Sequence, residues 1–321
     1  MNKEFNTSNI NKDIGQNENS IKTKLELADR KLFLKDKTIG ISISESDELN
    51  NLGYDIAHLN DLIIETARYL LSLGGKLAYG GDMRNGGFTE IIFDLLNYYK
   101  SDPLIHMRER FHSYLAWPIS LNLSPSQEAE LSDSVSFHKV SPPLELKKKI
   151  ELDKFLKPTS KEDFYIWSKC LTAMRKEMDS QCDARIFVGG KTRSFKGKCP
   201  GVLEELMLAI EHQQPIYLIG AFGGITYEAI SGLNGVQSDL LRKSFYLQNN
   251  DYSDFYEYYN LNSKDSIDFD SYFNIIKRLS WSGLSELNGL TIKENKRLSS
   301  TPHLTEMIFL ILKGLKNKFI V

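Results

Sequence analysis

The sequence predicts an α/β fold, a doubly wound sheet of mostly parallel strands with helical appendages at both ends. Residues 171–222 carry this prediction, because they read in order as the end of a helix, an apolar strand, a glycine turn, a helix and a second strand. Gly189 and Gly190 follow the first of these strands, at the carboxyl end where open α/β sheets bind ligands. Gly80 and Gly81 repeat the pattern after an earlier strand.

Composition and charge narrow the class of protein. Hydrophobic residues make up 41% of the 321-residue chain and charged residues 26%, which is typical of a soluble globular protein. The formal net charge of −2 indicates no field that would attract nucleic acid. No apolar run is long enough to span a bilayer and the first residues lack the apolar core of a signal peptide, so we expect a cytoplasmic protein that does not contact a membrane. Three cysteines without CxxC spacing indicate neither disulfides nor a metal site.

Three regions are expected along the chain. Residues 1–35 form a polar, mobile arm followed by a short helix. Residues 36–235 hold the α/β domain. Residues 236–321 form a helical extension with leucines and isoleucines as core candidates.

The first predicted strand, residues 38–44, alternates apolar and small side chains and runs into a loop. Ser42 and Ser44 stand at its end, where hydroxyls and backbone N–H groups can serve an anion. An ordinary loop would also account for these serines, but the glycine turns that follow favour a role in binding an anion. The clearest helix spans residues 55–73, with one apolar stripe and a Gly-Gly stop.

The glycine-dense turn after the next strand, residues 76–79, is a candidate phosphate loop. Gly80 and Gly81 let backbone N–H groups approach a phosphate at the positive end of the helix predicted over residues 89–99. Asp82 lies in the same turn, and Arg84 can grip phosphate oxygens with two hydrogen bonds.

The remaining elements complete the α/β alternation. Strands are predicted at residues 111–119 and 134–140, and helices at 161–179 and 225–233. The tyrosines within residues 237–262 suit base stacking, but we favour a surface helix that packs on its own protein.

The motif residues resemble a known family. The segment at 174–178 with Arg175, the turn at Gly189 and Gly190, and the segment at 201–205 resemble the signature of the LOG proteins. These are the lysine-decarboxylase-like phosphoribohydrolases that activate cytokinins, in which an M-x-x-R-K helix precedes P-G-G-x-G-T-x-E-E. Tyr79-Gly80-Gly81 resembles their first phosphate loop. The resemblance covers residues 38–233 and implies a Rossmann-like nucleotide-binding domain of the wider SLOG superfamily.

The departures from the LOG pattern suggest a particular branch. Residues 191–199 interrupt the glycine motif. This insert, together with W-P-I at 117–119 and the turn at 220–224, resembles the SLOG modules of bacterial antiviral defence, which sense NAD-derived signals. The insert brings four positive charges that a diphosphate, a dinucleotide or a cyclic signal would use; a solvated basic loop is the alternative. The expected nucleotide-binding residues also include Lys191, Gly201 and Glu205.

The resemblance leaves three hypotheses. The first is a sensor or effector that binds a nucleotide or an NAD-derived signal, without a cofactor. The second is an N-glycosidase in which Arg175 orients the sugar and Glu204 stabilises an oxocarbenium-like state. The third, a scaffold with a vestigial pocket, is disfavoured because both residues are present. We also expect a homo-oligomer, and a partner protein that binds the helical extension.

Overall fold

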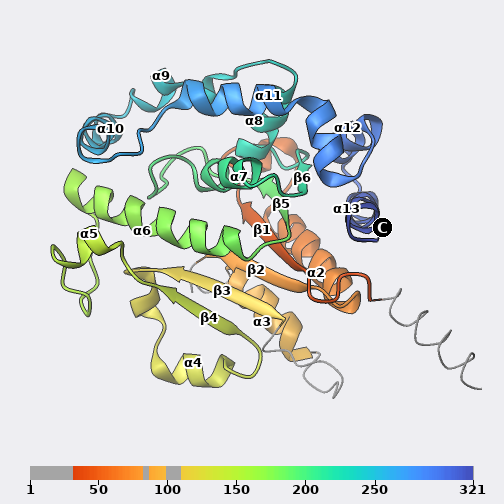
Figure 1. Ribbon diagram of the computed structural model, residues 1–321, viewed down its shortest axis with the longest axis horizontal. Coiled ribbons are helices and arrows are strands. Elements are labelled where there is room, and N and C mark those ends of the chain that lie inside the picture. Colours follow the sequence, from red (N-terminus) through yellow and green to blue (C-terminus); the bar gives the residue numbers. More distant parts are fainter. Residues whose placement is uncertain (1–31, 82–86, 99–109, 321) are drawn as a thin grey trace, which may run out of the picture.

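The computed structural model describes residues 32–81, 87–98 and 110–320. Within them it contains a six-stranded, all-parallel sheet in the order β4-β3-β2-β1-β5-β6 (Figure 1). The strands are β1 Thr38–Ser44, β2 Lys76–Gly80, β3 Phe111–Ala116, β4 Ser136–Val140, β5 Ala184–Gly189 and β6 Ile216–Ile219. The α/β prediction is therefore confirmed. Residues 1–31 of the arm and short helix predicted over residues 1–35 lie outside the described residues, as do Asp82 and Arg84.

The chain winds in two directions from the centre of the sheet. It runs outward from β1 to β4, returns to place β5 on the other side of β1, and continues to β6. The strand order reverses between β1 and β5, where Ser44 pairs with Gly189 at the carboxyl edge. Gly80 and Gly81 end β2 at the same edge, with β1 between the two glycine turns. Open α/β sheets bind ligands at such a switch point.

One face of the sheet packs against α2 (Ile56–Ser72), α3 (Phe88–Tyr98) and α13 (Leu304–Phe319). Helix α2 begins where the Asp55 carboxylate accepts hydrogen bonds from the backbone of Ala57 and His58, which satisfies amides that lack partners in the helix. Its apolar stripe, predicted from the sequence, meets Ile39 and Ile41 of β1 in the largest core cluster.

The other face packs against α6 (Lys161–Ser180), α7 (Gly201–Glu211) and α8 (Gly224–Leu233). Because successive side chains of a strand point to opposite faces, Ile186 of β5 packs with the α2 side and Phe187 with the α7 side. Every residue of β5 is buried, as a central strand covered on both faces requires.

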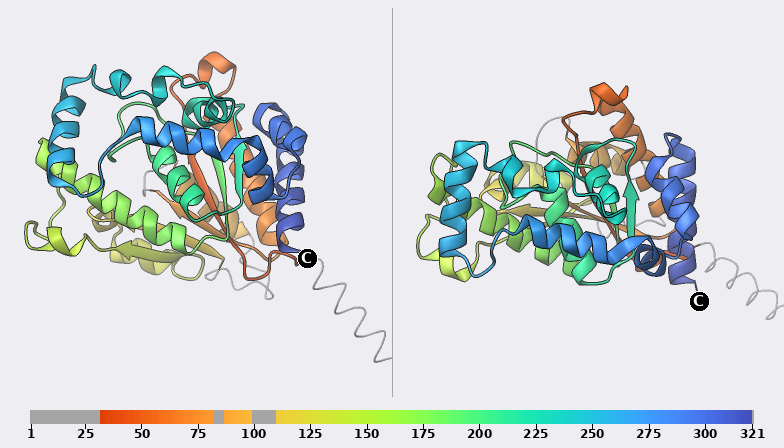
Figure 2. Two further views of the ribbon diagram at one scale, coloured as in Figure 1. Left: turned by 45° about the horizontal axis from the view of Figure 1, so that its top comes forward. Right: turned by 90° about the horizontal axis from the view of Figure 1, so that it is seen from above.

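Three helices after residue 235 cover this second layer: α9 (Lys243–Tyr246), α10 (Asn250–Asn262) and α11 (Phe269–Asn288). Helix α12 (Ile292–Ser300) follows them and leads to α13. Helix α10 packs on α6, α11 packs on α8, and α12 reaches β6, as the blue-toned helices of Figures 1 and 2 show. Tyr246 and Tyr259 are buried in the same core cluster, so the interpretation that these tyrosines pack on their own protein is confirmed for both.

Two short helices, α4 (Pro125–Leu131) and α5 (Leu144–Lys147), lie near β4 at the far end of the sheet (Figure 1). Short 3-10 turns at Asn50–Leu52, Ile119–Asn122 and Asp239–Leu241 join larger elements. Among the described residues, none of the helices combines the length and the apolar character needed to cross a bilayer.

Candidate functional site

The switch point joins the end of β1 to the turn after β5. The backbone N–H of Gly190 donates to the Ser44 carbonyl over 2.9 Å, and the N–H of Lys191 donates to the Ser44 hydroxyl over 3.0 Å. Four residues of the expected nucleotide-binding set, Ser44, Gly189, Gly190 and Lys191, therefore lie together.

The glycines at this edge allow two turns to touch through their backbones. Gly189 has φ 62°, and a Cβ there would lie 2.3 Å from the Ser44 carbonyl oxygen. Gly224, at the start of α8, has φ 65°, and a Cβ there would lie 2.4 Å from the Gly190 carbonyl oxygen. A side chain at either position would strain the backbone; at Gly189 it would push the β5 turn away from the end of β1, and at Gly224 it would separate the turns that follow β5 and β6.

Two acidic side chains of the loop after β1 accept hydrogen bonds from these turns. The Glu48 carboxylate accepts a 2.8 Å hydrogen bond from the Gly224 N–H, and Asp47 accepts one from the Thr192 hydroxyl. Helix N-termini attract anions, so at α8 the chain itself supplies the negative group. Neither acid was singled out from the sequence, because only the fold brings their loop to β5 and β6.

Arg175 of α6 and Glu204 of α7 form a buried ion pair. Arg175 donates a hydrogen bond to Glu204, and the Thr172 hydroxyl donates to the second Glu204 oxygen over 2.5 Å. Arg175 Nε also lies 3.5 Å from a carboxylate oxygen of Glu205. Burial by itself lowers the pKa of Arg175, but the two carboxylates outweigh it and hold that pKa above its usual value. The guanidinium therefore remains charged.

The insert predicted at residues 191–199 covers this pair. A Cβ at Gly197 would lie 2.9 Å from an Arg175 Nη, and one at Gly201 would lie 2.6 Å from the other, so backbone packs directly on the guanidinium. Lys198 Nζ lies 3.8 Å from Glu204, and the Lys198 carbonyl accepts a 2.7 Å hydrogen bond from the Tyr252 hydroxyl of α10. Arg175 and Glu204 are only 8% and 4% exposed as a result.

The insert ends on a buried thiol beside the pair. Cys199 is buried, and this burial, together with the nearby Glu204 carboxylate, raises the pKa of its thiol to about 12. The thiol is therefore protonated at neutral pH and shielded by the same segment that covers Arg175.

A second buried charge cluster is formed by side chains of β1, β5, α6 and α7. Arg185 of β5 is fully buried and donates to Glu205, to Asp179 over 3.1 Å and to the Ser42 hydroxyl over 2.5 Å. Ser42 in turn donates to Glu205 over 2.6 Å. Gly40 makes room for this arginine, because a Cβ there would lie 2.5 Å from the Arg185 Cδ. This buried network pairs the arginine with two carboxylates and holds Ser42 and Glu205 inside the protein, although Arg185 Nε itself has no hydrogen-bond partner among the described residues.

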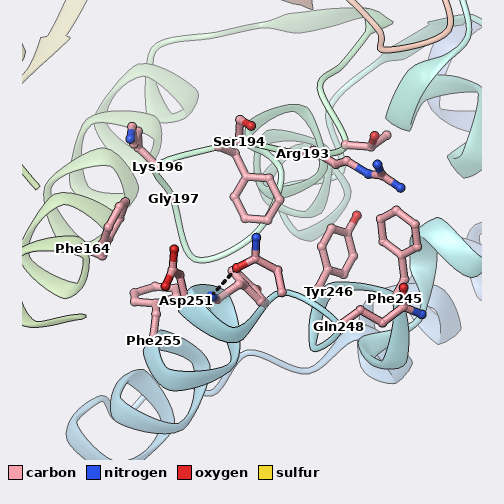
Figure 3. Close-up of a pocket in the computed structure, with 14 residues that line it drawn as sticks. Phe164, Arg193, Ser194, Lys196, Gly197, Phe245, Tyr246, Gln248, Asp251 and Phe255 are labelled. Atoms are coloured by element: carbon pink, nitrogen blue, oxygen red, sulfur yellow. Dashed lines mark hydrogen bonds between the residues drawn. The ribbon is translucent and has the colours of Figure 1, made fainter. Parts of the chain in front are cut away.

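A pocket of about 550 Å³ opens on the other side of the insert (Figure 3). Its lining comes from residues 192–197 of the insert, from α9 and α10 with the turn between them, and from Phe164 of α6. The first lining residue, Thr192, is two positions after Gly190, so the pocket adjoins the switch point. The sequence had indicated the basic residues of the insert and had offered the tyrosines of residues 237–262 for base stacking, but it did not show that the two segments meet.

The structure thus divides the predicted site residues into groups. At the switch point lie Ser44, Gly189, Gly190 and Lys191, and at the end of β2, one strand away, lie Gly80 and Gly81. Inside the protein lie Ser42, Arg175, Glu204 and Glu205, with the half-buried Gly201 against the Arg175 guanidinium. Asp82 and Arg84 fall outside the described residues. In the described ranges, no group of three or more His, Cys, Asp or Glu side chains is arranged to hold a metal ion.

The doubly wound parallel sheet, with glycine turns gathered at its switch point, defines a Rossmann-like protein. The model of one family, SLOG cluster2, matches residues 33–298, and the chain belongs to that family. Membership suggests a nucleotide-binding or related function. The match continues past residue 235 and so includes α9, α10 and α11. Comparison with curated proteins gives no match.

Proposed function

We propose that this protein binds a nucleotide or an NAD-derived signal at the carboxyl edge of its sheet, beside the switch point between β1 and β5. In this proposal it is a sensor or effector of bacterial antiphage defence. Family membership supports nucleotide binding, and the basic insert and the turn at residues 220–224 support the defence branch by their resemblance.

The observation that carries the proposal is the position of the pocket beside the β5 turn. The insert brings Lys191, Arg193 and Lys196 to this edge, and within the described residues none of the three makes a salt bridge. Cations without carboxylate partners next to a cavity attract anionic groups and orient them. A phosphate-bearing ligand matches this edge better than a neutral one.

Hydrolysis of an N-glycosidic bond at Arg175 and Glu204 is the second candidate. The two side chains lie together, as residues that act on one sugar must. However, a catalytic carboxylate must reach the sugar, whereas Glu204 bonds to Arg175 and Thr172 beneath the insert. The described state therefore favours binding over catalysis, and turnover would need the insert to open.

Incubation of the full chain with AMP, ATP, GTP, NAD and ADP-ribose tests the proposal. Native mass spectrometry identifies the retained species, and liquid chromatography with mass spectrometry identifies released products. We expect one member of the panel to be retained unchanged. Release of base or nicotinamide by the wild type would instead identify a hydrolase, and retention of none of the five would refute nucleotide binding.

A further inference from the structure

The pocket has an aromatic wall from α9 and one cation of the insert at each of its two ends, Arg193 beside Phe245 and Lys196 beside Phe164 (Figure 3). Arg193 and Lys196 come from the insert, while Phe245 and Tyr246 come from α9 on the facing side. Phe164 of α6 lies at one end. Three segments that are distant in the sequence therefore build a single cavity.

The aromatic wall is held in place by hydrogen bonds and ring contacts. The Tyr246 hydroxyl donates to the Leu240 carbonyl over 2.8 Å, and the Tyr252 hydroxyl donates to the Lys198 carbonyl over 2.7 Å. The ring of Phe195 meets both tyrosine rings edge to face, at centroid distances of 5.6 and 5.4 Å. Rings fixed in this way lose little conformational entropy when a ligand binds.

The cations lie over aromatic faces instead of against carboxylates. The Arg193 guanidinium lies 5.0 Å from the centroid of the Phe245 ring, and Lys196 Nζ lies 5.0 Å from that of Phe164. Asp251 is the one acidic residue in the lining of this pocket. Within the described residues neither cation makes a salt bridge, so both remain available to an anionic group.

These features define the chemistry of an occupant. A volume of about 550 Å³ falls within the range of pockets that bind organic ligands of drug size. Aromatic faces stack on planar rings, and the adjacent side-chain amides of Gln248 and Asn249 can meet the polar edge of such a ring. A ligand that joins a planar aromatic ring to an anionic group would therefore meet both the aromatic side chains and the cations.

We propose that this pocket holds the base of the bound nucleotide, with its phosphates on Arg193 and Lys196. The inference rests on the proposed function and adds a consequence, that α9 and α10 supply half of the binding site. A bound ligand would then link the C-terminal helices to the insert, and through the insert to the turn at Gly190.

Calorimetric titration of the full chain tests this assignment with ATP and NAD, and with ribose 5-phosphate as a probe that has a phosphate but no base. Phe245→Ala removes a ring of the aromatic wall, and we expect it to weaken binding of whichever nucleotide the wild type binds by about 10-fold or more. Its effect on ribose 5-phosphate should be small. Arg193→Ser should weaken both kinds of probe, because both carry a phosphate.

Two matched variants serve as controls. Lys243→Ser removes a cation that lies over the Tyr256 ring but does not line the pocket, and Phe309→Ala removes an exposed ring of α13. Neither should change nucleotide affinity. If Phe245→Ala does not fold, Arg193→Ser tests the pocket assignment in its place. The Arg193 side chain is exposed, so its substitution should leave the fold intact.

The outcomes separate this inference from the proposed function. Wild-type affinity in a folded Phe245→Ala or in Arg193→Ser, with nucleotide binding intact, would overturn the pocket assignment and leave nucleotide binding standing. Failure of every nucleotide in the panel to bind the wild type would overturn both.

Discussion

Glu204→Gln tests what the buried ion pair contributes. The amide has nearly the same shape as the carboxylate, but it is neutral and keeps only one accepting oxygen. Arg175 would lose its hydrogen-bonded charged partner and would retain the Glu205 carboxylate, 3.5 Å from its Nε. The substitution removes charge without opening a cavity.

The expected loss of stability follows from these contacts. Removing one partner of a buried ion pair typically costs about 3–5 kcal/mol. The remaining Glu205 carboxylate reduces that cost, while loss of a neutral hydrogen bond alone would cost about 1 kcal/mol. We therefore expect Glu204→Gln to lower the free energy of unfolding by about 2–3 kcal/mol, an estimate that lies between these values.

Urea denaturation followed by circular dichroism measures this change, with Glu211→Gln as the control. Glu211 ends the same helix and is exposed, so its substitution should have little effect. Equal stability of the two variants would refute the description of Arg175 and Glu204 as a tightly paired, buried unit.

The same variant separates the two candidate functions. In an N-glycosidase, Glu204→Gln should retain the ligand while turnover falls by about 100-fold or more. A binding protein has no turnover to lose, and only its affinity or its response to the ligand should change. Undiminished release of base or nicotinamide by the variant would exclude a catalytic role for this carboxylate.

Three further predictions concern the core, the insert and the C-terminal helices. Arg185→Met removes the buried arginine that bonds Asp179 and Glu205, and the free energy of unfolding measured in urea should fall by about 3–5 kcal/mol. Tyr252→Phe removes the hydrogen bond that holds the insert, worth about 1 kcal/mol, so a thiol reagent should label Cys199 about fivefold faster in the native protein. The hydrogen bond from Arg297 lowers the pKa of Glu306 from 4.5 to about 2. The stability that the ionised Glu306 contributes is therefore complete above pH 4.5 and is lost as the pH falls through 2. The thermal unfolding of Glu306→Gln should accordingly differ most from that of the wild type above pH 4.5.

The first two of these predictions have a matched control variant, and the third has an outcome that would contradict it. Arg297→Met removes an arginine from an exposed pair and should cost far less than Arg185→Met; equal costs would contradict the burial argument. Tyr256→Phe should leave labelling of the thiol unchanged, and a Tyr252→Phe protein that labels at the wild-type rate would show that its hydrogen bond does not hold the insert. For Glu306→Gln, a stability difference that does not shrink toward pH 2 would contradict the assigned pKa.

The sequence by itself determined the local structure. Apolar periodicity separated strands from helices, and glycines marked the turns where strands end, because these signals depend on residues close in the chain. The basic insert was visible for the same reason, as four cations within residues 191–199. The resemblance carried by residues 174–178 and 201–205 indicated the SLOG superfamily before the fold was known, and the family match confirms it.

Tertiary structure alone decided which of these features meet. Arg185 stands in an apolar strand, and nothing near it in the sequence shows that Glu205 pairs with its charge and that the Ser42 hydroxyl accepts a hydrogen bond from it. The sequence likewise aligned Arg175 and Glu204 with catalytic residues, whereas the fold covers both with the insert. The pocket depends on α9 and α10 reaching the insert from residues about 50 positions later. Charge pairing and cavity shape arise from contacts between distant segments, so local residue patterns do not determine them.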